Sequence, residues 1–184
     1  EYKNLPRGYY ASFFIIRKTE SEAIFRTEGS GEELVKETVN AGLVDTTPIR
    51  RVVISKRKQT AVERRMGREF LNKHELLRMN EKGKICMLNT NGPCEHCIDC
   101  FLYGFAAGGG GAQKSRVMTD DAYSLSSVAQ IAARRTFNAP YDNGTMRNEG
   151  ETSRSINKDE YVRPQSHFLD IETLKDVTLP ELQY

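Results

Sequence analysis

The chain has 184 residues, a net charge of only +2 and an apolar fraction of 38% with no tryptophan. This length suits one ordinary domain with a small insertion, and the composition predicts a modest core with substantial loops. The longest apolar run, 13–16, is far shorter than the roughly 18 residues that span a bilayer, which excludes a membrane protein. No signal peptide is recognisable, so a cytoplasmic location is predicted. Because an initiator methionine is missing, we expect that a piece precedes residue 1.

The N-terminal third predicts two strands followed by a helix. Tyr9–Arg17 is dense in aromatic and β-branched residues, which is typical of a strand buried on both faces at its centre. Ile24–Thr27 is predicted as a short second strand. Residues 32–41 predict a helix, because two acidic residues complement its N-terminal dipole and Gly42 suits its C-terminal cap.

A second strand–helix unit follows. Ile49–Lys58 predicts a strand, and Thr60 to about Met79 predicts a helix on which Val62, Met66 and Phe70 form one apolar stripe. The order strand, short strand, helix, strand, helix predicts an α+β sandwich of the ferredoxin-like or RNA-recognition-motif type, in which helices cover one face of a sheet.

Positive charge is concentrated between Arg50 and Arg78. This stretch contains ten basic residues and three glutamates, a net charge of +7, so the net charge of the rest of the chain is about −5. A field of this sign attracts a polyanion, although the net charge of the whole chain conceals it. For one helix alone, a solvated charged face is the simpler interpretation. Because three basic residues also precede the helix, we favour a phosphate-contacting surface formed by Lys56, Arg57, Lys58, Arg64, Arg65 and Arg68.

All four cysteines of the chain, Cys86, Cys94, Cys97 and Cys100, lie within fifteen residues. Two overlapping Cys-x2-Cys steps are typical of a chelating knuckle, and four thiolates satisfy a tetrahedral zinc ion with a closed shell. We therefore predict structural zinc. Disulfides, a redox pair and an iron–sulfur cluster are the alternatives. His96 competes with Cys86 for the fourth ligand position.

The region after the cysteines predicts a loop, short strands and a hairpin. Four consecutive glycines at 108–111 indicate a flexible loop, and 114–119 predicts a strand of alternating polarity. Residues 128–137 fit either a strand or a short helix. Turn chemistry at 138–145 predicts an extended, projecting hairpin whose arginines and rings contact nucleic acid. The residues assigned to this contact are Arg134, Arg135, Phe137, Tyr141 and Met146.

The tail from Lys158 is acidic and lacks the strand that would close the sandwich. We therefore expect either a missing C-terminal part or numbering that runs across gaps. Four segments are predicted: 1–80 as the first part of the core, 81–105 as a zinc-knuckle insertion, 106–160 as the core return with a thumb hairpin, and 161–184 as the acidic C-terminal segment of a truncated core.

Catalytic motifs are scarce in this sequence. No Walker loop, dinucleotide fingerprint or HExxH occurs, and no pattern links the three histidines to a nucleophile. Asp120 and Asp121 form the one adjacent acidic pair in a plausible loop, and adjacent side chains usually diverge. A binder of nucleic acid is favoured. Two alternatives stay open: a metal-dependent nuclease that cuts a single strand at regular intervals, and a zinc-ribbon protein that binds duplex DNA.

Five segments carry a further signal: Phe25–Gly29, Lys56–Thr60 with Glu63-Arg64, Cys97–Ala106, Lys114–Val117 and Thr136–Met146. Together they resemble the backbone subunit of type I-D CRISPR Cascade complexes, a member of the RAMP superfamily. The resemblance runs in order from about residue 5 to residue 180, and its last motif is highly specific.

The resemblance implies an RNA-recognition-motif core, a zinc-binding insertion on the four cysteines and a thumb at Arg134 to Met146. It implies a non-catalytic protein that polymerises along CRISPR guide RNA, joins other Cascade subunits and supports recognition of a DNA or RNA target. Family chains are much longer, so part of the sheet is expected to be missing. In type III relatives an aspartate after the first strand cuts the target, and Glu28 or Asp45 is the nearest candidate here. Guide-phosphate binding is implied for Lys56, Arg57, Lys58, Arg64, Lys114 and Arg116.

Overall fold

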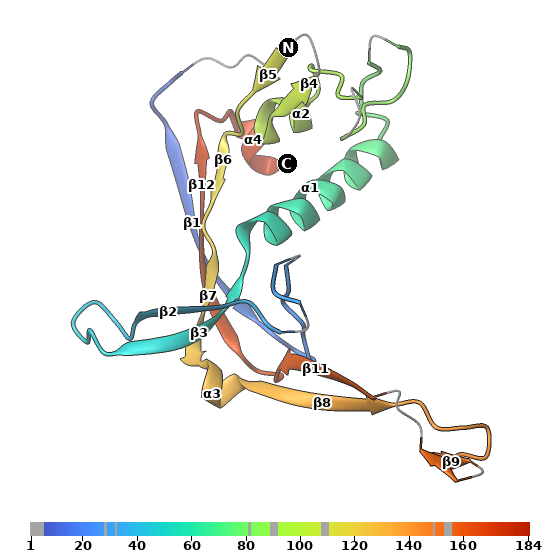
Figure 1. The fold of residues 1–184 in the computed structure, drawn as a ribbon. Coiled ribbons are helices and arrows are strands. Elements are labelled where there is room, and N and C mark those ends of the chain that lie inside the picture. The colour runs from blue at the N-terminus through green and yellow to red at the C-terminus, as the bar shows by residue number, and fades with distance from the viewer. Residues whose placement is uncertain are drawn as a thin grey trace. The chain divides into compact units, whose positions relative to one another are not determined.

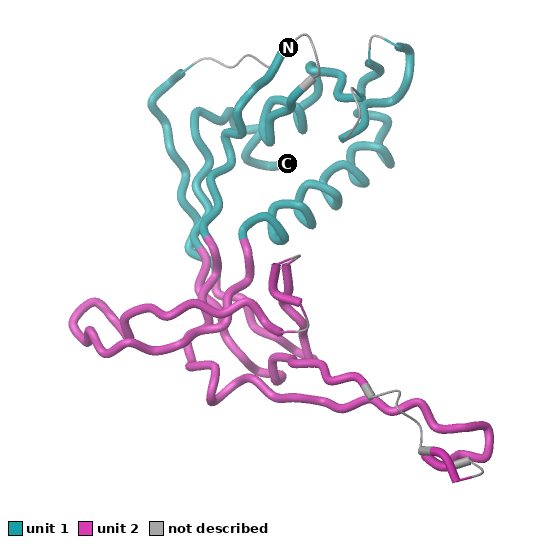
Figure 2. The backbone as a smooth tube through the Cα atoms, viewed as in Figure 1, with its two compact units in different colours: residues 1–15, 56–120, 171–184 teal, residues 16–55, 121–170 magenta. Residues whose placement is uncertain are grey.

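The computed structural model describes residues 6–27, 29–31, 33–80, 82–88, 92–107, 111–148, 150–152 and 156–184. The chain forms two compact units, which Figure 2 shows in different colours. Unit 1 comprises Glu1–Ile15, Lys56–Asp120 and Ile171–Tyr184, and unit 2 comprises Ile16–Ser55 and Asp121–Asp170. The strands β1 (Tyr10–Lys18) and β12 (His167–Lys175) contribute residues to both units.

The largest sheet has the strand order β1-β12-β7-β3-β2, and β6 also pairs with β12 (Figure 1). Its other strands are β2 (Lys36–Asn40), β3 (Pro48–Ile54), β6 (Val117–Thr119) and β7 (Ala122–Ser127). The pairs β2–β3, β3–β7, β7–β12 and β6–β12 are antiparallel. The protein is therefore a mixed α/β structure built on an antiparallel sheet.

Unit 2 packs its core between these strands and a long hairpin. The short helix α3 (Val128–Ile131) leads into β8 (Ala132–Asn138), which pairs with β11 (Ile156–Val162). Two further short strands, β9 (Arg147–Asn148) and β10 (Glu151–Thr152), pair with each other. Its apolar core is a cluster of the buried side chains of Leu34, Val52, Ile54, Ala122, Ile131, Val162 and Phe168.

Unit 1 holds the helices α1 (Lys56–Lys73), α2 (Ile98–Tyr103) and α4 (Leu179–Gln183), with the strand pair β4 (Phe105–Ala107) and β5 (Gly111–Gln113). Its apolar core is small and centres on Leu102, Val117 and Leu174. The described part of the chain contains no helix that combines the length and the apolar character needed to cross a membrane.

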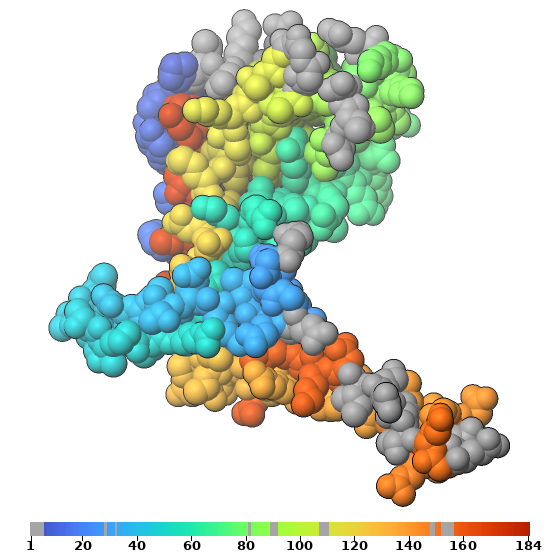
Figure 3. All heavy atoms as spheres, viewed as in Figure 1, coloured from blue at the N-terminus to red at the C-terminus, as the bar shows by residue number. Residues whose placement is uncertain are grey.

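The helix predicted for residues 32–41 is wrong, because Lys36–Asn40 forms the strand β2. This segment lies beside β3 in register, with Lys36 opposite Val52 and Val39 opposite Ile49. Pairing with a neighbouring strand therefore overrides the helix-end signals of the sequence. The loop between the two strands lies at the surface (Figure 3). Its Leu43 and Val44 side chains are fully exposed.

Two predictions at the N-terminus also need correction. Ile24–Thr27 forms no strand, and only an isolated bridge between Ala23 and Val162 lies nearby. The strand predicted at Tyr9–Arg17 is confirmed as β1, but it is not buried on both faces, since Phe14 is 76% exposed. Phe13, which points to the opposite face, is also 44% exposed.

The predicted strand and helix around residue 55 are confirmed with shifted bounds. The strand ends at Ile54, so the basic residues after it belong to the first turn of α1, and the helix ends at Lys73. The apolar stripe of Val62, Met66 and Phe70 is exposed. The side of α1 that is buried against the rest of unit 1 instead carries Gln59 and Leu71.

The C-terminal half forms more regular structure than its turn-rich sequence predicts. The predicted pairing of the hairpin is wrong, because Arg134–Phe137 pairs with residues 157–160 rather than with Met146 and Arg147. The predicted strand at 114–119 is confirmed at Val117–Thr119, and 128–137 contains both the short helix and the strand that were considered. The acidic tail contributes β12, which lies between β1 and β7 in the main sheet.

Candidate metal centre and basic surface

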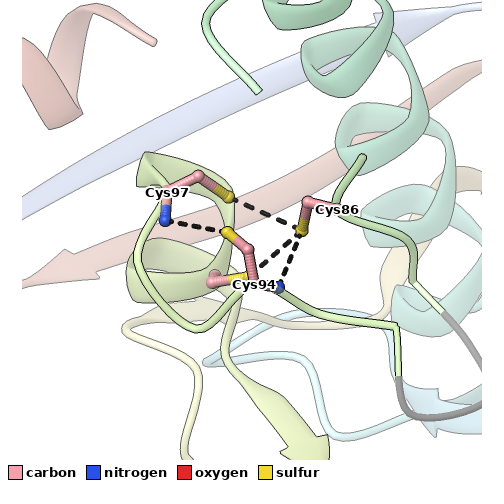
Figure 4. Close-up of side chains that lie close together, drawn as sticks. Cys86, Cys94 and Cys97 are labelled. Atoms are coloured by element: carbon pink, nitrogen blue, oxygen red, sulfur yellow. Dashed lines mark hydrogen bonds between the residues drawn. The ribbon is translucent and has the colours of Figure 1, made fainter. Parts of the chain in front are cut away.

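The four cysteines predicted as metal ligands converge in unit 1. Their sulfur atoms all lie within 4.8 Å of one another, and all four residues are buried. The Sγ atom of Cys86 lies 3.6 Å from that of Cys100 and 3.8 Å from that of Cys97. Four sulfurs bound at about 2.3 Å around one zinc ion are about 3.8 Å apart, so the cluster has the size of a tetrahedral thiolate site. Figure 4 shows Cys86, Cys94 and Cys97 pointing toward one another.

Two separate backbone segments bring these thiols together. The Cys86 amide donates a hydrogen bond of 2.9 Å to the Arg78 carbonyl, which fixes the first segment. In the second, Glu95 adopts a positive φ of 64° in the turn between Cys94 and Cys97, and Cys97 then precedes the first residue of α2. Backbone N–H groups also donate to sulfur: the Cys94 amide to Cys86 Sγ at 3.2 Å and the Cys97 amide to Cys94 Sγ at 3.3 Å. Such bonds favour the thiolate that a metal requires.

The structure forms no disulfide among these cysteines. The sulfur atoms of Cys86 and Cys100 are 3.6 Å apart, far longer than the bond of about 2.05 Å in a disulfide. His96 is exposed and stands outside the cluster, so Cys86 takes the fourth position. Hydrogen bonds from Cys100, Cys94 and Cys97 lower the pKa of Cys86, whereas contacts with Cys86, Cys94 and Cys97 raise the pKa of Cys100. The cluster could hold a metal ion, which would replace the shared protons.

Asp99 joins the cysteine cluster to the long helix. It lies between Cys97 and Cys100 in sequence, and its side chain is fully buried. Arg64 donates to Asp99 from Nε at 3.0 Å and from Nη2 at 3.0 Å, and Arg68 donates from Nη1 at 2.7 Å. One buried carboxylate thus holds two guanidinium groups of α1, one helical turn apart.

Arg68 also contacts the cysteine cluster itself. Its Nη1 lies 3.6 Å from Cys86 Sγ, and its Nη2 donates to the Cys86 carbonyl. The Nη2 of Arg64 donates to the Gly104 carbonyl at 2.9 Å. Both arginines, predicted as phosphate contacts, are therefore engaged in bonds within unit 1, and we leave them out of the phosphate-binding surface proposed below.

Four other basic residues of α1 are exposed in its N-terminal half, and Lys73 lies in its last turn. Lys56, Arg57 and Lys58 form the first turn, which contains no acidic residue, and Arg65 follows two turns later. Positive side chains at a helix N-terminus oppose the helix dipole, where an anion is favoured. The cations of the first turn therefore lower the stability of the helix somewhat, and they make its N-terminus strongly positive.

A cavity of about 550 Å³ lies beside these cations in unit 1. Its wall on α1 includes Lys56, Arg57 and Arg65, and Tyr103 at the end of α2 contributes an aromatic ring. This volume falls within the range of about 300–1,000 Å³ that is typical of ligand sites. The cavity was not predicted from the sequence.

Comparison with known proteins was made for the whole chain. The sequence model of a family described as Csc2 Crispr matches residues 1–184. The chain belongs to the Csc2 CRISPR family. Its fold is similar to the crystal structure of Csc2 from Thermofilum pendens, with a TM-score of 0.57 and 20% sequence identity. That match covers 94% of this chain and 56% of the other, so the chain spans little more than half the length of that relative. No curated protein matches the sequence.

Membership of the Csc2 family confirms that the chain belongs to a CRISPR family, as the five sequence segments indicated. The antiparallel sheet agrees with the predicted class of fold. The assignment to type I-D complexes and the roles of individual residues remain predictions.

Two basic residues implied by the resemblance have different surroundings in this Csc2 chain. Lys114 is exposed just after β5. Arg116 is only 5% exposed, and its guanidinium pairs with the buried Glu181 carboxylate and donates to the Asp176 carbonyl at 2.8 Å. Glu181 in turn accepts from the Thr178 amide at the start of α4. Arg116 therefore holds α4 against the rest of unit 1, and we leave it out of the proposed RNA-binding surface.

The residues assigned to the thumb lie on or beyond β8 in unit 2. Arg134 is exposed and Phe137 is 45% exposed, whereas Tyr141 and Met146 are half-buried. Arg135 pairs with Glu22, and its guanidinium also lies 5.2 Å from the centre of the Tyr161 ring. Of this set, Arg134 and Phe137 present the most accessible surface for a ligand.

The candidates for a nuclease are not brought together. Among the residues that the structure describes, the four cysteines form the one group of histidine, cysteine and acidic side chains close enough to hold a metal. Asp45 is exposed in the β2–β3 loop, where it accepts a hydrogen bond from the Thr47 amide at 2.9 Å, and Asp120 is exposed at the end of unit 1. Glu28 lies outside the described residues. No observation therefore favours metal-dependent cutting.

Sequence analysis missed Asp99 and Glu181, the two buried carboxylates that bind arginine in unit 1. A signal for Asp99 was available, because it lies directly before a predicted ligand and Arg64 and Arg68 share a face of α1. Glu181 also has a local signal, because Thr178 and Glu181 form a capping box at the start of α4, but its arginine partner is 65 residues away.

Proposed function

We propose that this chain binds CRISPR guide RNA without regard to base sequence, as the repeating backbone subunit of a type I-D Cascade complex. The observation that carries the proposal is the exposed cationic N-terminal half of α1, formed by Lys56, Arg57, Lys58 and Arg65. Lysine and arginine neutralise phosphates of any sequence, so such a surface gives affinity and register rather than base selectivity. Membership of a CRISPR family makes guide RNA the appropriate polyanion.

The metal in this proposal is zinc, and its role is structural. Four buried thiolates complete a tetrahedral shell and leave no position for a reacting water, which is the arrangement of structural rather than catalytic zinc. The Asp99 contacts then connect the metal-bound segment to α1, so that the metal supports the helix that carries the cations. The protein is accordingly proposed to be a binder and not an enzyme.

In this proposal the thumb is the long hairpin of unit 2, which β8 and β11 form. Phe137 offers a ring for stacking and Arg134 offers a cation for the RNA backbone. The sheet is proposed to be an RNA-recognition-motif core of the RAMP type. Copies of the chain would then line up along the guide, with other Cascade subunits and a DNA or RNA target, in the cytoplasm.

The proposal is tested by measuring binding of fluorescent oligonucleotides to protein that carries its metal. Single-stranded RNA is expected to bind, and shuffling its sequence at constant length is expected to leave the affinity unchanged, because the contacts are to phosphates. A duplex DNA of equal length serves as competitor and is expected to compete poorly. Preferential binding of the duplex would instead support the zinc-ribbon alternative, and absence of RNA binding would reject the proposed function.

A further inference from the structure

The cavity beside α1 has walls of three chemical kinds, all within unit 1. Ala61, Leu88 and Val117 provide an apolar surface, and Val117 is buried at 7% exposure. Thr60 and Thr119 provide hydroxyl groups 3.4 Å apart. The third kind of wall is a flat surface that an aromatic ring and a guanidinium group form. A site that combines apolar walls with a few fixed polar groups is typical of ligand pockets.

Tyr103 and Arg64 form the flat part of the wall. The Arg64 guanidinium carbon lies 5.7 Å from the centre of the Tyr103 ring. Because Asp99 and the Gly104 carbonyl hold this guanidinium, its plane is rigid and loses little conformational freedom when a ligand stacks on it. Burial and the charges of nearby Glu63, Glu172 and Asp99 raise the pKa of Tyr103, so its ring stays neutral.

The hydroxyl groups that line the cavity can form hydrogen bonds with more than one kind of partner. A hydroxyl can both donate and accept, and it rotates to meet its partner. Ser115 already shows both roles, since its Oγ accepts from the Val117 amide at 3.1 Å and donates to the Val117 carbonyl at 2.9 Å. Such groups tolerate the edges of different bases, which agrees with binding that does not depend on sequence.

We propose that this cavity holds one unstacked nucleobase of the bound RNA. This inference rests on the proposed function and adds a base-binding site to its phosphate-binding surface. Bases splayed out of a single strand are stacked on aromatic rings or on arginine planes, both of which the wall supplies. The phosphates on either side of the base then lie within the field of Lys56, Arg57 and Arg65, which line the same cavity.

The test compares an RNA oligonucleotide with an abasic oligonucleotide of the same length and charge. The wild-type protein is expected to bind the base-bearing strand about five- to a hundredfold more tightly, which is the usual worth of stacking one base. Ala61→Trp fills the cavity without changing charge, and it is expected to abolish this preference while binding of the abasic strand remains. Val62→Trp is the matched control, because Val62 is the next residue on α1, is exposed and does not line the cavity.

The outcomes separate the inference from the proposed function. Equal binding of both strands by the wild-type protein, or an undiminished preference in Ala61→Trp, overturns the base pocket and leaves phosphate binding intact. Failure to bind either strand rejects both proposals. If Ala61→Trp does not fold, photocrosslinking of 5-iodouracil RNA to the wild-type protein decides: a crosslink to Tyr103 is expected, and crosslinks confined to unit 2 overturn the inference. Uridine monophosphate is titrated in parallel, and binding as tight as that of the RNA would reassign the cavity to free nucleotides.

Discussion

Replacing Asp99 with alanine is expected to destabilise unit 1 by about 3–5 kcal/mol, the usual cost of removing one partner from a buried ion pair. The Asp99 side chain is fully buried, and the side chains of Arg64 and Arg68 are only 21% and 11% exposed. Without the carboxylate, two positive charges lose their shared partner, and Arg64 keeps its hydrogen bond to the Gly104 carbonyl and its contact with the Tyr103 ring. Urea unfolding, followed by circular dichroism, measures the loss.

Two further variants test whether the loss of stability in Asp99→Ala comes from the lost carboxylate charge. Asp99→Asn keeps the shape and one acceptor oxygen but removes the charge, so an intermediate loss is expected. Arg65→Ala removes an exposed arginine of the same helix and is expected to change stability by less than about 0.5 kcal/mol. If Asp99→Ala is no less stable than Arg65→Ala, the carboxylate does not fasten α1 to the cysteine segment.

Removal of the metal is expected to be the most damaging change of all. Binding of structural zinc to four-ligand peptides contributes about 10–16 kcal/mol at neutral pH, and this binding energy is folding energy. Purified protein is expected to contain about one zinc per chain. A chelator or Cys100→Ser is expected to lower the melting temperature and to disorder α2, because Cys100 is fully buried within that helix.

His96→Ala is the matched control for the metal, since His96 lies between the ligands Cys94 and Cys97 but is exposed. It is expected to leave both zinc content and melting temperature unchanged. Loss of zinc from this variant would show that the histidine is a ligand. Protein that contains no metal by elemental analysis, and whose melting temperature does not respond to a chelator, would contradict the structural role of zinc.

The cysteine site was predictable because its ligands are close in sequence. The sequence indicated all four cysteines, and the fold shows that Cys86 rather than His96 is the fourth member of the cluster. The charged residues of α1 were harder to interpret. Sequence shows that Arg64, Arg65 and Arg68 are positive, but only the fold shows that Asp99 holds the first and third and that Arg65 is exposed.

The largest error in the fold also has a physical cause. Residues 32–41 carry acidic residues at the start and a glycine after the end, and these features suit a helix. Lys36–Asn40 forms a strand because β3 lies alongside and because Lys36 reaches Glu160 with an N–O distance of 2.6 Å. Contacts between residues more than a hundred positions apart cannot be read from local pattern.

The central claim is that the exposed cations of α1 bind the phosphates of guide RNA. The dependence of RNA affinity on salt tests it most directly, because each phosphate contact adds about 0.7 to the slope of log K against log salt for a single strand. Replacing Lys56, Arg57 and Arg65 together with alanine is expected to reduce that slope by about 2 and to weaken binding of all RNA sequences alike. An unchanged slope, with unchanged affinity in the folded variant, would contradict the claim.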